Sequence, residues 1–220
     1  MDLSPIWLSL KVSIIAVSVV FVVGSFLAIF LHRFKFRGHT AVEAIIMMPL
    51  VLPPTVVGFS LLLLFGRNAP LGRLLGYFGI EIVFSWWAAA IASMVVALPL
   101  MYQGLKSSLE SIDANLEQAA RTLGAGEIRV LRTVTLPLAW PGLVSGVVMA
   151  FTRAIGEFGA TLMVAGNIPG KTQTIPLAIY SYSSSGDTAN AGYMVLTLIA
   201  LAFSLVFAVS AWRKKLIRWF

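Results

Sequence analysis

Apolar residues form long blocks along this chain, separated by short polar segments. Five blocks contain at most one charged side chain and cover residues 12–31, 44–66, 82–103, 133–155 and 188–212. A helix of about 20 apolar residues crosses about 30 Å of hydrocarbon, so each block can span a bilayer. Since a span must satisfy its own backbone hydrogen bonds, we expect helices here. The expected fold is an all-α polytopic membrane bundle of about five helices, with residues 1–220 as a single transmembrane domain.

Composition agrees with a membrane protein. Hydrophobic residues make up 59% of the chain and charged residues 11%, which is far from the composition of soluble domains. The net charge of +7 comes from basic residues between the apolar blocks, so we expect membrane lipid as their partner and no nucleic acid. The chain has no cysteine, which excludes disulfides, thiolate metal sites and thiol catalysis.

The basic residues predict an orientation. With five spans, one side of the membrane receives eleven Lys and Arg residues and the other side five. Basic residues concentrate in the cytoplasmic loops of membrane proteins. We therefore expect the N-terminus outside, the C-terminus in the cytoplasm, and a cytoplasmic loop over residues 104–135. The basic segment Arg213–Trp219 is interpreted as a cytoplasmic anchor.

The second block carries prolines that interrupt a helix. Pro49, Pro53 and Pro54 lie within it and Gly58 follows. Each interior proline removes a helical hydrogen bond, so this span is expected to be kinked or broken and to face the bundle interior. A static bend and a gate fit this pattern equally well.

The fourth block carries small residues at every fourth position. Gly142, Gly146, Ala150 and Ala154 would form one stripe along a helix and let another helix approach closely. The pattern leaves open whether that helix belongs to the same chain or to a second copy.

The loop from Ser111 to Pro137 holds the most informative pattern. Ser111 or Asp113 can cap a helix whose apolar face is unusually small at Ala119 and Ala120, and Gly124 can end it. A second short helix is expected from Glu127 toward Pro137. The pattern alone fits equally a helix-turn-helix that contacts a partner and a helix that lies on lipid headgroups.

The spacing of the landmarks carries a family resemblance, and that resemblance favours contact with a partner. Three residues separate Ala120 from Gly124, and nine separate Gly124 from the segment Val134-Thr-Leu-Pro137. This spacing resembles the EAA signature of permease subunits of bacterial and archaeal ABC importers. At the usual Glu position this chain has Gln118, with Glu117 one place earlier.

Further segments extend the resemblance across most of the chain. Residues 49–58, 116–125, 156–161 and 167–176 together are similar to the molybdate and sulfate permease group of that family. The resemblance implies a coupling loop that docks on an ATP-binding subunit, through a set of residues formed by Glu117, Gln118, Ala119, Ala120, Arg121, Gly124, Leu136 and Pro137.

The resemblance also implies a function and an assembly. It indicates a homodimer in the bacterial or archaeal cytoplasmic (inner) membrane, bound to two ATPase subunits and supplied by an extracytoplasmic binding protein. The expected function is ATP-driven import of an oxyanion by alternating access, with molybdate as the expected substrate and tungstate or sulfate as alternatives. The chain itself is expected to be no enzyme and to hold no cofactor.

Segment 165–172 nearly matches a phosphate-binding loop, with Ala165 in place of the first glycine. It follows a membrane helix and Pro169 removes a backbone donor, so we expect no ATP binding there.

Arg153 and Glu157 lie one helical turn apart near the outer end of the fourth span. They are interpreted as an ion pair, with contact to an oxyanion on the transport path as the alternative.

Other functions are less consistent with the residues. His32 and His39 flank a basic loop, lack carboxylates at metal spacing, and are expected near headgroups, so no metal site is predicted. An intramembrane protease would need a nucleophile with a base, or paired metal ligands, inside the spans. A carrier that works without an ATPase would need titratable groups near the midplane. No histidine lies well within a span and the spans offer no carboxylate pair, which opposes the protease. Purification with and without an ATPase partner would separate the carrier from an ATP-driven importer.

Overall fold

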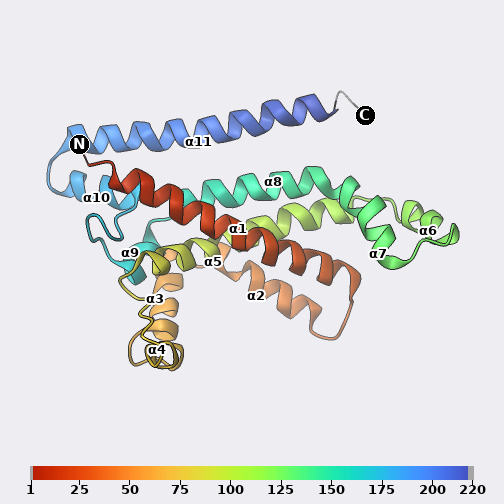
Figure 1. Cartoon of the computed structure of the whole chain (residues 1–220), viewed down its shortest axis with the longest axis horizontal. Helices are drawn as coiled ribbons and strands as arrows, with labels where there is room; N and C mark the ends of the chain where they lie inside the picture. The colour runs from red at the N-terminus through yellow and green to blue at the C-terminus, as the bar shows by residue number, and fades with distance from the viewer. Residues whose placement is uncertain (1, 218–220) are drawn as a thin grey trace.

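The computed structural model describes residues 2–217, and within this range the secondary structure is helical without strands (Figure 1). The elements are α1 Ser4–Arg33, α2 His39–Val51, α3 Pro54–Phe65, α4 Pro70–Gly76, α5 Trp86–Glu110, α6 Ala114–Thr122, α7 Glu127–Val130, the π-helical turn η1 Leu131–Thr135, α8 Leu136–Ile155, α9 Gly159–Ala165, α10 Ile175–Ser184 and α11 Thr188–Ile217. The predicted all-α membrane bundle is confirmed.

Four stretches are long and apolar enough to cross a membrane: α1, α5, the run Glu127–Ile155 and α11. The pair α2 and α3 makes a fifth if it is taken as one broken span. The helices extend beyond several of the expected blocks. α5 continues past residue 103 to Glu110, and the second short helix predicted from Glu127 does not end near Pro137 but runs on through η1 into α8.

Helix α5 is the centre of the bundle. In the most apolar 18-residue stretch of α5, 61% of the residues are buried, against 6% in the corresponding stretch of α11. α5 packs along α8 and α1, whereas α11 lies along one side of the bundle, and its buried Met194 packs with Ile175 and Ala178 of α10 (Figure 1). The backbone of the basic segment 213–217 continues α11, and residues 218–219 of the predicted anchor lie outside the described residues.

The second block breaks into two helices at Pro53 and Pro54, whereas Pro49 lies inside α2 and does not end it. Leu52 ends α2, Pro53 precedes α3, and Pro54 occupies the first turn of α3, where its missing N–H costs no hydrogen bond. The axes of α2 and α3 differ by 115°. The predicted break is therefore confirmed, while a gating role stays a prediction.

Gly58 lies beyond the break and serves a different purpose. A Cβ atom there would come within 2.7 Å of Met163 Cβ and 2.9 Å of Ala160 Cα. Its absence lets α3 pack directly on α9, the short helix that follows α8. Residues 53–58 and 156–161, which are far apart in sequence, thus lie against each other.

The small-residue stripe of the fourth block packs on α5 of the same chain. A Cβ atom on Gly104 of α5 would lie 2.7 Å from the Gly146 Cα atom and 3.2 Å from the Gly142 carbonyl oxygen. Ala150 and Ala154 continue the contact in a buried cluster with Ala97 and Met101. Because lipid competes equally for apolar side chains, such close backbone packing is a main source of stability between membrane helices.

We expect Gly104→Ala to lower the apparent melting temperature of the detergent-solubilised protein. The added methyl group meets backbone atoms that cannot move aside, and overpacking of this kind costs about 1–3 kcal/mol. Gly192→Ala in α11 is the matched control, since no heavy atom lies within 4 Å of its Cβ position. Equal melting temperatures for the two variants would contradict the packing described here.

Candidate functional site

The segment between α5 and α8 projects from one end of the bundle (Figure 1). Its first helix, α6, begins where the Asp113 carboxylate accepts a hydrogen bond of 2.9 Å from the Asn115 backbone N–H. It ends before Gly124, whose φ of +83° favours glycine. The predicted capping and termination of this helix are confirmed.

The apolar side chains of this segment are exposed. Leu123 is 89% exposed, Ile128 68% and Leu116 49%, and Gln118 and Ala119 are exposed as well. A helix of nine residues with no buried residue gains little stability from its own packing. The segment therefore presents an apolar surface that nothing in the described chain covers.

Polar side chains hold α6 against the start of α8. Glu117 accepts a 2.6 Å hydrogen bond from the hydroxyl of Thr135, a residue that is 1% exposed. Arg121 lies 3.1 Å from a Glu117 carboxylate oxygen and 2.6 Å from one of Glu127. Glu117 and Arg121, which the family resemblance implied as contacts to a partner, are thus paired within the chain.

The end of α1 joins the same network. The guanidinium of Arg33 lies 3.3 Å from the Glu127 carboxylate and also donates to the Glu127 backbone carbonyl oxygen. Hydrogen bonding from Thr135, and secondarily from Arg121, lowers the pKa of the Glu117 carboxyl below its ordinary value although desolvation opposes the shift. Glu117 is therefore ionised at neutral pH and attracts Arg121.

The remaining landmarks of the loop lie at the base of α8. Leu136 begins α8 and Pro137 occupies its first turn, where a proline is tolerated. Leu136 is half-buried and Pro137 is exposed, as is Ala119, while Ala120 is half-buried. The structure brings the predicted loop residues together at one end of the bundle.

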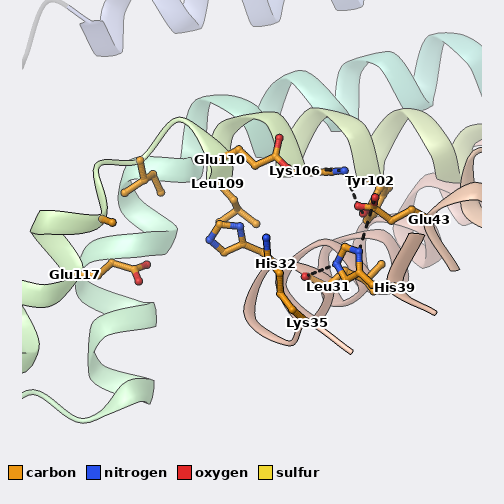
Figure 2. A pocket seen from close by; sticks show the side chains of 12 residues that line it. Leu31, His32, Lys35, His39, Glu43, Tyr102, Lys106, Leu109, Glu110 and Glu117 are labelled. Carbon is orange, nitrogen blue, oxygen red and sulfur yellow. Dashed lines mark hydrogen bonds and ion pairs between the residues drawn. The ribbon is translucent and has the colours of Figure 1, made fainter. Parts of the chain in front are cut away.

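Beside α6 lies a cavity of about 470 Å³ between the ends of α1 and α5 and the start of α2 (Figure 2). Glu43 accepts hydrogen bonds of 2.5 Å from both Tyr102 and Lys106 on one side of the cavity, and Glu117 lies on the opposite wall. The same cavity is lined by His32 and Lys35. The cluster of Glu43, Tyr102 and Lys106 was not predicted, because no local sequence pattern links α2 to α5.

His39 differs from its sequence-based interpretation. Its Nδ1 atom lies 3.9 Å from a Glu43 carboxylate oxygen, so a carboxylate does accompany it, and its Nε2 atom lies 2.8 Å from the Leu31 carbonyl oxygen. These contacts tie the start of α2 to the end of α1. Among the described residues no group of three or more His, Cys, Asp or Glu side chains could hold a metal ion.

Arg153 and Glu157 form the predicted ion pair at the opposite end of the bundle, with 2.5 Å between Nη1 and Oε2. The other oxygen of Glu157 accepts a 2.8 Å hydrogen bond from the Ala160 N–H in the first turn of α9. Glu157 is 1% exposed as a side chain, whereas Arg153 is 29% exposed. The carboxylate is thus fully engaged, and the guanidinium keeps part of its surface free.

The segment that resembles a phosphate-binding loop is a closed turn. The backbone N–H groups of Lys171, Thr172 and Gln173 all donate to the Ile168 carbonyl oxygen, at 3.1, 2.9 and 3.1 Å. Donors that point at one internal carbonyl cannot surround a phosphate. The segment also lies between two helices, α9 and α10, instead of following a strand.

Comparison with known proteins places the chain in a family. Residues 20–219 match the family described as binding-protein-dependent transport system inner membrane component. The chain belongs to this family. It is a permease subunit of an ABC transporter, as the resemblance in its loop implied.

Two relatives align over nearly the whole chain. The molybdenum transport system permease protein ModB of Escherichia coli (strain K12) is 45% identical over 96% of this chain and 93% of its own length. The protein of the same name from Haemophilus influenzae (strain Rd) is 44% identical over 98% of this chain and 94% of its own length.

A solved structure shares the fold. A chain of the inward-facing MetNI methionine ABC transporter matches with a TM-score of 0.77 and 20% identity, covering 96% of this chain and 94% of that one. At this level of identity the match concerns the arrangement of helices alone.

Proposed function

We propose that this chain is the permease subunit of an ATP-driven molybdate importer, working as a homodimer with two ATPase subunits and an extracytoplasmic binding protein. The observation that carries the proposal is the exposed α6 surface, held on two spanning helices, in a chain 45% identical to a molybdenum transport permease along 96% of its length. No covalent chemistry is assigned to the chain, since the partner hydrolyses ATP.

The proposed orientation follows the charge distribution. The end of the bundle that carries α6 receives Arg33, Lys35, Lys106 and Arg129, so we place it in the cytoplasm, with the N-terminus outside. In this orientation α6 reaches a cytoplasmic ATPase. Nucleotide states that favour different permease conformations would then drive alternating access.

The proposed contact to the ATPase includes Gln118, Ala119, Ala120 and the turn at Gly124. The proposed moving element at the other end is the break at Pro53 and Pro54, with Pro49 one turn earlier inside α2. Its bend brings α3 onto α9, next to the ion pair, so that a change in the bend would alter the surroundings of Arg153.

The substrate and the assembly are tested together by co-purification and uptake. The chain is expressed with candidate ATPase and binding-protein subunits, and uptake of labelled molybdate is measured in proteoliposomes. We expect uptake that requires ATP and all subunits, with stronger competition by tungstate than by excess sulfate, since tungstate matches molybdate in size and charge. Uptake without the ATPase would favour an independent carrier, and complete competition by sulfate would favour a sulfate permease.

We expect Gly124→Trp to abolish association with the ATPase while membrane insertion stays normal. The substitution forces an unfavourable φ on a bulky residue and places an indole on the α6 surface. Gly124→Asn is the control, because asparagine tolerates positive φ and is small. Co-purification of both variants at the level of the unsubstituted chain would contradict a docking role for this turn.

We expect Arg153→Gln to reduce molybdate uptake without preventing assembly. The exposed part of the guanidinium is proposed to attract the dianion on its path, while Glu157 still caps α9 in the variant. Uptake is compared with the amount of assembled complex on a sizing column. Normal uptake by a fully assembled variant would leave the ion pair a purely structural role.

A further inference from the structure

Neighbouring residues at the centre of the coupling loop have opposite environments. The Glu117 side chain is 18% exposed and faces the base of α8, whereas Gln118 is exposed. One residue of α6 thus faces the bundle and the next one faces away from it. The two faces of this short helix can serve different purposes.

The inner face meets a buried partner across a long interval of sequence. Thr135 lies in the π-helical turn Leu131–Thr135, directly before α8, and its hydroxyl donates to Glu117 at 2.6 Å. π-helical turns within α-helices occur frequently at functional sites. A charge-assisted hydrogen bond from a residue that is 1% exposed is a strong attachment for a helix with no buried residue of its own.

The other ties of α6 are weaker. The ion pairs of Arg121 with Glu117 and Glu127 involve side chains that are 39% exposed for Arg121 and 59% for Glu127. Pairs of this exposure contribute little because water and salt screen them. The Glu117–Thr135 bond is therefore the strongest of these side-chain ties between α6 and the π-helical turn that leads into α8.

Exposed apolar side chains follow the end of α6. Leu123 comes directly after the last residue of α6, Ile128 lies in α7, and both are more than two-thirds exposed. Neither residue belongs to the set that the sequence resemblance implied. An apolar groove on the ATPase, with one group that bonds to the Gln118 amide, fits this surface.

We infer that Glu117 is a positioning residue of the coupling loop, which through the Thr135 hydroxyl makes α6 move as one body with α8, while Gln118, Leu123 and Ile128 contact the ATPase. This inference rests on the proposed function. Displacement of α6 by the ATPase then passes directly into the spanning helix α8.

The test compares coupling with association in the reconstituted complex of permease, ATPase and binding protein. Thr135→Val removes the hydroxyl and keeps the shape of the side chain. We expect the number of molybdate ions moved per ATP hydrolysed to fall at least about fivefold, the lower end of ordinary coupling effects, with the Kd for the ATPase within about twofold of the unsubstituted value. Thr135→Ser retains the hydroxyl and should restore the ratio.

Thr133→Val is the matched control. Thr133 lies in the same π-helical turn, and its hydroxyl donates to the Arg129 carbonyl oxygen at 2.7 Å instead of reaching α6. The same substitution at this site should leave the transport ratio unchanged. A reduction common to both threonine variants would assign the effect to the turn itself and overturn the inference.

A second set of variants separates the two faces. Leu123→Ser and Ile128→Ser should raise the Kd for the ATPase by roughly tenfold each, with a normal ratio in the complexes that form. Glu117→Ala should resemble Thr135→Val, and the double variant should be no worse than either single one, because both remove the same bond.

Two further results would also overturn the inference and leave the proposed function standing. One is a normal transport ratio for Thr135→Val, and the other is a Glu117→Ala variant that loses ATPase affinity as Leu123→Ser does while its transport ratio stays normal. If the unsubstituted chain binds no ATPase at all, the proposed function itself is contradicted. This result differs from the two above, which contradict only the positioning role of Glu117.

Discussion

The close contact between α5 and α8 is the constraint on which the rest of this molecule depends. At Gly104, Gly142 and Gly146 the two backbones approach so closely that a single Cβ atom would strike main-chain atoms. In lipid, apolar side chains gain little by packing on each other compared with acyl chains, so shape and backbone proximity decide which helices associate. This contact brings the end of α5 and the start of α8 together, and these are the two ends of the coupling loop.

The loop combines exposure with attachment. α6 is too short to be stable by itself, and the apolar residues Leu123 and Ile128, which follow it in the loop, are exposed. The Asp113 cap, the turn at Gly124 and the Glu117–Thr135 bond compensate for the missing packing. A surface that is exposed for a partner can therefore keep a defined orientation relative to the spanning helices.

At the other end of the bundle, a few specific contacts likewise hold short helices in place. The break before Pro54 turns α3 by 115° relative to α2, and Gly58 lets α3 rest on α9. The buried carboxylate of Glu157 connects the end of α8 to the first turn of α9 and holds Arg153. Movement of α8 at its loop end thus has a structural route to the residues near the ion pair, through one continuous helix.

The sequence by itself determined the membrane class, the helical fold, the break at the prolines and the cap at Asp113, and it marked the loop that is proposed to couple to the ATPase. These features depend on local properties: the length of apolar blocks, the missing N–H of proline, and the spacing of small residues. It also predicted a close helix contact at Gly142 and Gly146, without indicating which helix makes it.

Only the tertiary structure decided which groups meet across long intervals of the chain. Gly104 lies opposite Gly146, Thr135 reaches Glu117, and Arg33 reaches Glu127 because folded helices bring them together, and no local pattern encodes such pairs. For the same reason the sequence did not indicate that Glu117, expected to contact a partner, forms a hydrogen bond within the chain. The direction in which a short helix presents each side chain depends on where its two neighbours in the bundle hold it.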